Sequence, residues 1–514
     1  MKVKRTGRFF SISFLLLLIC YLCTTVIAEL PSPRNWAETA VDDLHFIRAT
    51  LRENHPGPID SKNLAFQDWY RHGFELALAR AQAARDFAGY FFAIKFYMAG
   101  FQDGHLGALG ERHLLDHLSE GRLHRKWPGF TVAYKNNSFI VDATDPSVSP
   151  LQNVGDQLIA CDGRTTAAWA DEIIGGYAGL WNLPGTRPEM APLLLIDEGN
   201  PFIRMPDQCT FHGRGGNRTI GLHWVAITDV ELRSKFMAYE ESSDTASIHI
   251  FGDGAYWVRL PSFETNSQEN SASLKRITDE LRQQAETMRH ARVIVFDVRG
   301  NRGGNSTTGE ALLVQLWGEQ YIKYIQPQPA AIDWRLSRGN LRFLKDTNLA
   351  TLRRQFGSES GQAREYEDLL SKMQQALDGG KDFYREEIAR PPASDSFRVS
   401  AVPVLLTDHA CASACLDFAD IVLALPRAQH AGLETSADAV YIDNRAVALP
   451  SGLGLIGFSM KAYRGRPRGN NQSYRPAHVY PGDIADITQL EKWVMSEFLI
   501  RPAPNQNLAG ENRN

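Results

Sequence analysis

The pattern of apolar and polar positions divides the chain into three stretches. Apolar residues recur at helical spacing from residue 36 to about 118, which predicts a helical N-terminal region. From 125 to 228 short apolar runs alternate with turns, so we expect a β-rich region there. From 240 to 500 apolar runs of strand length alternate with helical segments, the pattern of βαβ units. The fold class expected is therefore α/β, in an α+β multidomain arrangement.

One segment inside the third stretch differs from its surroundings. Residues 340–393 are charged and favour helix, and their apolar positions share one helical face: Tyr366, Leu369, Leu370, Met373 and Leu377. That face must pack on something. The segment is either a lid over a cleft or an insertion without a catalytic role.

A strand, a tight corner and a helix follow one another around Ser413. The apolar run Val402–Leu406 ends in small residues, and an apolar-periodic segment begins after them. Ala412 and Ala414 flank the serine, so little bulk obstructs an approaching carbonyl, and the N–H groups that open the helix can face negative charge. Serine needs a base to be a good nucleophile. The alternative is a buried helix start made of small residues.

A glycine-rich loop lies about a hundred residues upstream. The apolar strand that begins near Arg292 ends at Asp297, and Gly300, Gly303 and Gly304 follow it. Glycine adopts backbone conformations closed to other residues and lets main-chain N–H groups approach a ligand. A plain turn between strand and helix would also use glycines.

Taken together, these segments resemble the tail-specific (C-terminal processing) serine peptidase family. Residues 297–304 match its D-[LV]-R-x-N-x-G-G strand and loop, and residues 412–414 match its A-S-A corner. Asp103-Gly104-His105 matches the D-G-H of one branch, in which that histidine is the general base. The resemblance implies a crotonase-like catalytic core over 240–500, preceded by a helical cap. It implies a secreted or periplasmic endopeptidase that cuts extended or unfolded polypeptide.

The resemblance also assigns roles within the site. Ser413 is the expected nucleophile and His105 its base, while the backbone N–H groups of Gly303 and Ala414 are expected to hold the oxyanion. Relatives with a Ser–Lys dyad carry lysine where this chain has Asp438, so a dyad at that position is excluded. Glu434 is the candidate third residue.

Two further acids compete with Glu434 for the role of orienting the histidine, and the sequence does not rank them. They are Glu310 and Asp438.

The hairpin at residues 154–163 resembles that of PDZ domains, which capture an extended peptide by strand addition. Residues 125–228 are therefore expected to be a PDZ-like module, with a purely structural β-module as the alternative. The stretch 452–457 matches GxGxxG, but Gly and Pro break the segment after it where a dinucleotide site needs a helix. We interpret it as a glycine-rich strand or hairpin.

The N-terminus is typical of a secretory signal. Basic residues precede an apolar run over 9–27, and Ala28 provides a cleavage site, which predicts a signal peptide over 1–28 and export to the periplasm or outside the cell. An uncleaved run would be a membrane anchor; after cleavage no further span is expected. The remainder has 51 basic and 59 acidic residues, a net charge of −8, which argues against a nucleic-acid partner.

Four cysteines follow residue 28, and an exported protein can pair them. Cys161 and Cys209 are the expected pair because both fall in one region, whereas a bond between Cys411 and Cys415 would lie across the serine corner. Their spacing matches no zinc pattern and no HExxH occurs, so neither a metal nor another cofactor is expected.

Two other functions are compatible with these motifs. The chain could bind a peptide or another ligand without turnover, since the lysine is missing. Alternatively, the serine could act on a small ester or amide.

Overall fold

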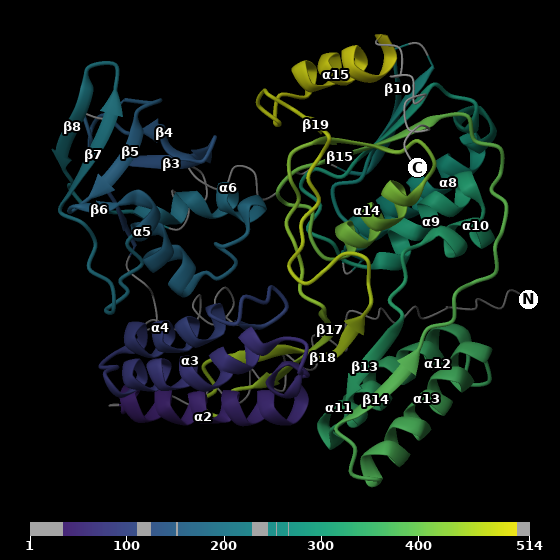
Figure 1. Ribbon diagram of the computed structural model, residues 1–514, viewed down its shortest axis with the longest axis horizontal. Coiled ribbons are helices and arrows are strands. Elements are labelled where there is room, and N and C mark those ends of the chain that lie inside the picture. The colour runs from purple at the N-terminus through teal and green to yellow at the C-terminus, as the bar shows by residue number, and fades with distance from the viewer. Residues whose placement is uncertain are drawn as a thin grey trace, which may run out of the picture.

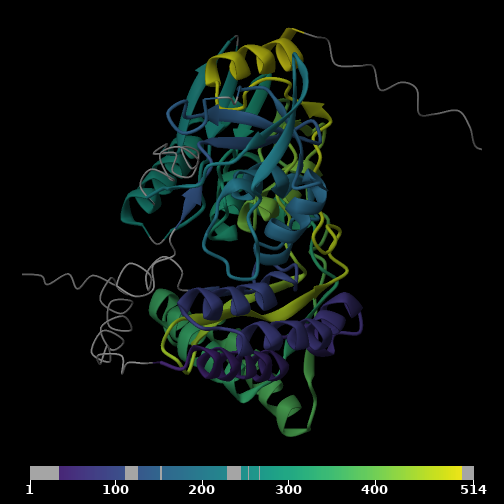
Figure 2. The same ribbon diagram turned by 90° about the vertical axis from the view of Figure 1, so that its left-hand side faces the viewer.

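The computed structural model describes residues 34–109, 125–150, 153–228, 245–252, 254–265 and 267–500. They form two tiers (Figures 1 and 2): a β-rich module and an α/β body lie side by side above, and the remaining helices lie below around a second sheet. The predicted signal peptide lies outside the described residues. Within the described ranges, no helix is long and apolar enough to cross a membrane.

Three helices form the N-terminal part of the lower tier: α2 (Trp36–Asn54), α3 (Leu64–Gln82) and α4 (Phe87–Ala99). Each begins after a residue whose side chain accepts a backbone N–H of the first turn; these residues are Asn35, Asn63 and Asp86. A 3₁₀ turn (Gly57–Ile59) separates α2 from α3. Strand β1 (Gly107–Leu109) follows α4, so the D-G-H turn lies between a helix and a strand.

The β-rich module is built on one antiparallel sheet of order β3-β4-β5-β7-β8, with the short β6 beside β5. The strands are β3 (Phe130–Lys135), β4 (Ser138–Thr144), β5 (Gln157–Cys161), β6 (Arg164–Thr165), β7 (Gln208–Gly213) and β8 (Gly216–Gly221). A short helix, α5 (Thr166–Ala170), packs Trp169 into its core. Cys161 and Cys209 oppose each other on β5 and β7 and form the disulfide expected from the sequence.

The α/β body contains a six-stranded sheet of order β10-β11-β12-β15-β16-β19. The strands are β10 (Ser247–Phe251), β11 (Ala255–Arg259), β12 (Val293–Asp297), β15 (Val402–Thr407), β16 (Gln429–Gly432) and β19 (His478–Val479). The sheet is parallel except for β10. The buried apolar run 293–296 thus forms a central strand, as its composition predicts.

Alternate residues of these strands face two different layers. Ile294 and Phe296 share a core with helices α8 (Gln268–Arg289), α9 (Ser306–Trp317) and α14 (Ala414–Ala424). Val293 and Val295 pack instead with α15 (Ile487–Met495) on the opposite face. The mixed α/β class predicted from the sequence is confirmed, whereas the PDZ-like and crotonase-like assignments stay predictions.

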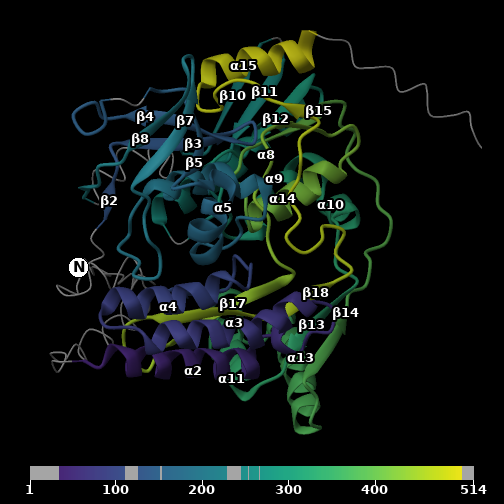
Figure 3. The same cartoon turned by 60° about the vertical axis from the view of Figure 1, so that its left-hand side comes forward.

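The lower tier contains the second sheet. Its long strand β18 (Leu455–Arg464) pairs with β1, β13 (Ala331–Arg335) and β17 (Tyr441–Ala448), and β14 (Phe383–Glu387) extends it beyond β13. The stretch 452–457 therefore leads into a strand, as predicted. Figures 1 and 3 show β17 and β18 beside the N-terminal helices. Phe458 and Ile456 share the apolar core of those helices.

The predicted insertion forms helices α11 (Arg338–Phe343), α12 (Ala350–Phe356) and α13 (Gly361–Asp378). The apolar face of α13 packs through Met373 and Leu369 against Trp334 of β13. In Figure 1 these helices lie at the lower end of the molecule, away from α14.

A buried arginine joins the helix after Ser413 to the segment before β17. The Arg468 guanidinium, 2% exposed, pairs with Asp417 and Asp420 of α14 and with Asp438. Arg466 also pairs with Asp438. Asp438, which stands at the position of the family's lysine, is therefore held among arginines.

Replacement of this arginine should destabilise the protein. We expect Arg468→Met to lower the free energy of unfolding by about 3–5 kcal/mol, because buried Asp420 loses its arginine and Asp438 keeps only Arg466. Arg364→Met is the control, since Arg364 and its partner Glu359 are exposed and such pairs change stability by no more than about 0.5 kcal/mol. Urea unfolding followed by tryptophan fluorescence measures both; equal losses would contradict the assignment.

Candidate active site

Ser413 occupies a sharp corner between β15 and α14. Its backbone has φ 53° and ψ −122°, a left-handed conformation unusual for a residue with a side chain, and α14 begins at the next residue. The serine side chain makes no capping hydrogen bond and is partly exposed. Such strained residues persist only where their surroundings hold them, and they cluster at functional sites.

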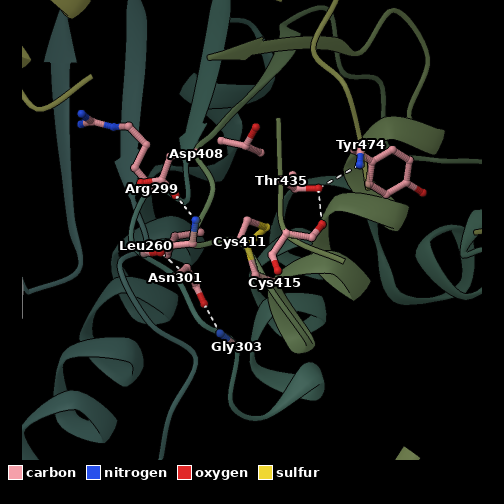
Figure 4. The surroundings of a disulfide bond; sticks show 12 residues. Leu260, Arg299, Asn301, Gly303, Asp408, Cys411, Cys415, Thr435 and Tyr474 are labelled. Atoms are coloured by element: carbon pink, nitrogen blue, oxygen red, sulfur yellow. Dashed lines mark hydrogen bonds between the residues drawn. A yellow bond between two sulfur atoms is a disulfide. The ribbon is translucent and has the colours of Figure 1, made fainter. Parts of the chain in front are cut away.

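A disulfide between Cys411 and Cys415 spans this corner, a pairing that the sequence left open. Both cysteines are fully buried and their Cα atoms are 5.3 Å apart. Figure 4 shows the bond between the glycine loop with Asn301 and Gly303 on one side and the segment with Thr435 and Tyr474 on the other. The disulfide fixes both ends of the three-residue segment that has Ser413 at its centre.

The glycine loop approaches the corner closely. A Cβ atom added to Gly303 would lie 2.9 Å from the Cβ of Ser413, 2.9 Å from the nitrogen of Ala414 and 2.8 Å from the carbonyl oxygen of Ala412. Its φ of 101° also favours glycine. The structure thus brings Gly303, Ser413 and Ala414 together.

Asn301, the asparagine of the matched D-[LV]-R-x-N-x-G-G motif, ties the loop to the corner. Its buried side chain accepts the N–H of Gly303 at 2.9 Å and donates to the carbonyl of Leu260, while its own carbonyl accepts the N–H of Ala412. The Gly303 donor is therefore engaged within the loop. Among the described residues, Ala414 N–H has no hydrogen-bond partner, which leaves it available to an oxyanion.

A buried ion cluster holds the start of the loop. The Asp297 carboxylate accepts two hydrogen bonds from the Arg299 guanidinium and one from the indole of Trp257, and Arg259 lies 3.6 Å away. Burial alone would raise the pKa of Asp297, but the two arginines hold it below its usual value. Asp297 thus stays ionised and positions the loop.

Three hydrogen bonds hold His105, one to its ring and two to its backbone. Its Nδ1 lies 3.0 Å from the carbonyl oxygen of Tyr441, its backbone N–H donates to Asp103, and its carbonyl accepts from Asn444. A carbonyl can only accept a hydrogen bond, so Nδ1 carries a proton, and in the neutral form of the ring Nε2 keeps its lone pair. An imidazole in that tautomer can act as a general base through Nε2.

A cavity of about 290 Å³ lies beside His105 and is open on one side. It is lined by Gly104, His105, Gly107, Asn444, Arg445, Ala446 and Gly457. A Cβ atom on Gly107 would meet nothing within 4 Å, so the glycines leave room for a ligand to approach the backbone next to the imidazole.

Glu434, the candidate third catalytic residue, is held by other partners. Its carboxylate accepts from Ser473 and Arg475, and within the described part of the chain no hydrogen bond or ion pair joins it to His105 or Ser413. Nor do His105 and Ser413 share a hydrogen bond there. The Tyr441 carbonyl occupies the position at Nδ1 expected for an acid, and the orienting role of Glu434 stays a prediction.

Neither of the two competing acids forms a hydrogen bond or ion pair with His105 among the described residues. Asp438 pairs with Arg466 and Arg468. Glu310 lies on α9, where burial raises its pKa while Lys323 lowers it. In the described residues, no group of three or more histidine, cysteine, aspartate or glutamate side chains is arranged to hold a metal ion.

Residues 255–466 match the family model of peptidase family S41. This confirms the resemblance stated from the sequence motifs, and it covers the glycine loop and the serine corner. No curated protein sequence matches the chain.

Solved structures share the fold over most of the chain. Mature CPAF has 14% sequence identity and a TM-score of 0.56, with 87% of this chain and 93% of that chain covered. Mature CPAF complexed with lactacystin has 14% identity and a TM-score of 0.55, with 87% and 94% covered. At this identity the similarity concerns the fold alone.

Removal of one disulfide should mainly slow the reaction of Ser413, whereas removal of the other should mainly lower the free energy of unfolding. Replacing Cys411 and Cys415 by alanine should slow the acylation of Ser413 by a fluorophosphonate about 10-fold, because misplacing a reacting group by fractions of an ångström is costly. The loss of stability should be only about 2 kcal/mol because the bonded residues are four positions apart.

The matched control removes Cys161 and Cys209, which are 48 positions apart. It should lower the free energy of unfolding by about 4 kcal/mol and leave acylation within 2-fold of the parent. Equal acylation rates in the two double variants would show that the Cys411–Cys415 bond does not position the serine.

Proposed function

Residues 255–466 belong to peptidase family S41, a family of serine-type peptidases, and from this we propose that the chain is an exported endopeptidase that hydrolyses extended or unfolded polypeptide. Ser413 is the nucleophile in this proposal and His105 its base. The observation that carries it is the serine corner: a left-handed, partly exposed Ser413 packed against Gly303 at the N-terminus of α14.

The proposed reaction proceeds through an acyl-enzyme. The Oγ of Ser413 attacks the scissile carbonyl carbon and its proton passes to Nε2 of His105, which then protonates the leaving amine. Water attacks the ester, His105 takes the water proton, and collapse of the second intermediate releases a carboxylic acid and restores the Ser413 hydroxyl. The Tyr441 carbonyl keeps the imidazole in the required tautomer throughout.

The negative charge that forms on the substrate oxygen requires hydrogen-bond donors. The Ala414 N–H at the start of α14 is one, and the N–H of Gly303 is the second once its bond to Asn301 is released. Donors of this kind contribute about 3 kcal/mol each to transition-state stabilisation.

The substrate assignment is supported by the space beside His105. The open cavity beside His105 can hold part of an extended chain. The β-rich module would present that chain if it binds peptides by strand addition, as a PDZ-like domain does. Export through the N-terminal signal completes the proposal.

One observation favours a second candidate function, in which the protein binds a peptide without cleaving it. The Gly303 N–H donates to Asn301, so one of the two donors expected for the oxyanion is occupied in this structure. If that bond is permanent, the cleft holds a ligand and turnover is lost.

Replacement of the nucleophile tests the proposal directly. We expect Ser413→Ala and His105→Gln each to lower kcat by about 10⁴-fold or more in digests of an unstructured protein mixture, because the other half of the pair cannot act alone. Ser396→Ala, an exposed serine, should match the parent.

New termini identified by mass spectrometry report the cleavages. If Ser413→Ala produces the same termini as the parent, Ser413 is not the nucleophile. If neither the parent nor any variant produces new termini, the binding function is favoured.

Glu434→Gln separates two ways of orienting the base. Because Tyr441 already holds Nδ1 and Glu434 contacts Ser473 and Arg475, we expect kcat to fall less than 10-fold. An acid that orients a catalytic histidine directly typically costs about 10⁴-fold when converted to its amide. A loss of that size would place Glu434 in the catalytic set.

A further inference from the structure

The D-G-H turn lies against a buried histidine at the end of α2. His55 is fully buried, and its Nδ1 accepts the backbone N–H of Gly57 at 2.9 Å. Burial lowers the pKa of His55 to about 3, so the ring is neutral, and its proton must be on Nε2 because Nδ1 is an acceptor. That Nε2 lies 3.8 Å from a carboxylate oxygen of Asp103.

Asp103 connects this histidine to the proposed base. One oxygen, Oδ1, accepts the backbone N–H of His105 at 2.9 Å. The other, Oδ2, faces His55, and neither Oδ2 nor the Nε2 of His55 has a hydrogen-bond partner among the described residues, although both atoms are buried. Buried polar atoms without partners are rare in folded proteins and call for a physical explanation.

His55 also contacts the other group that holds His105. Its ring meets the edge of the Tyr441 ring at 4.9 Å and stacks on Phe66 at 4.8 Å. The Tyr441 carbonyl fixes Nδ1 of His105, and the Tyr441 hydroxyl donates to Asp60. His55 thus contacts both residues that hold the proposed base: Asp103, which accepts its backbone N–H, and Tyr441, whose carbonyl accepts from its ring.

We propose that His55 and Asp103 are positioning residues for His105, and that Asp103 performs this role as a carboxylate. With Asp103 ionised, the Nε2–H of His55 faces an acceptor. A proton on Oδ2 would place two donors opposite each other, and His55 cannot change tautomer without losing its bond from Gly57. A proton on Oδ1 would remove the acceptor for the His105 N–H.

Burial and the charged groups around Asp103 determine the pH at which its carboxylate gains a proton. Burial raises the pKa of Asp103 to about 6; nearby His105 acts to lower it and Asp438 acts to raise it. Asp438 comes from the segment before β17 and is paired with Arg466 and Arg468. His55, from the end of α2, is neutral. Asp103 therefore gains its proton as the pH falls through about 6, and the turn loosens below that pH.

Two isosteric changes test this role, which rests on the proposed function. Asp103→Asn should lower kcat about 10-fold with KM within 2-fold, and the acid limb of kcat should become less steep because only the protonation of His105 remains. The Tm at pH 8 should stay close to that of the parent, because removal of a buried charge offsets the contact between the new amide NH2 and the Nε2–H of His55. His55→Phe should keep the ring contacts and also lower kcat about 10-fold.

His45→Phe, an exposed histidine on the same helix, is the control and should not change kcat. A residue that only supports the fold would lower the Tm and leave the pH profile unchanged. If Asp103→Asn behaves in that way, or keeps the kcat and acid limb of the parent, the positioning role is overturned.

A second measurement does not require turnover. In a Ser413→Ala background labelled with ¹⁵N-histidine, the His105 ring signals, assigned by their loss in His105→Gln, should show one tautomer with the proton on Nδ1. Adding Asp103→Asn should produce a mixture of tautomers, and an unchanged spectrum would overturn the positioning role. Absence of serine-dependent cleavage in the parent would instead refute the proposed function. The spectra would still decide whether Asp103 positions His105.

Discussion

The parallel pairing of β12 with β15 determines where the site forms. Asp297, the last residue of β12, lies opposite Leu406 on β15, so the chain leaves both strands at the same edge of the sheet. Loops that follow neighbouring parallel strands meet outside their carboxyl ends, where open α/β sheets bind ligands. The glycine loop and the serine corner meet there, and the missing side chain of Gly303 allows the backbones to touch.

The candidate base is positioned by a different part of the fold. His105 lies between α4 and β1 in the lower tier, and its ring is fixed by a carbonyl of β17. Strands β17 and β18 continue the chain from the α/β body into the core of the N-terminal helices. The alignment of His105 therefore depends on packing between segments more than 300 residues apart in sequence, in addition to the catalytic sheet.

Local chemistry explains what the sequence could predict. The strand at 293–297, the glycine loop and the small residues around Ser413 each carry a signal of composition or periodicity, and they lie together as expected. The Tyr441 contact has no such signal, since any residue can offer a carbonyl. His55 likewise resembles an ordinary polar residue until its partner is known, whereas Asn301 is a fixed position of the matched motif whose role appears only with its partners. Four-residue spacing left Cys411–Cys415 open, because it suits a helix start as well as a bridge.

The pairing of β1 with β18 has a consequence for the order of synthesis. Gly107 of β1 pairs with Gly457, so this strand pair closes only after most of the chain has left the ribosome. Contacts of such long sequence separation form slowly and late in folding. The N-terminal helices therefore pack on their sheet only after β18 has been made. Until then His105 is not aligned, whatever the state of the serine corner. Under the proposed function, the topology itself delays proteolysis until folding is nearly complete.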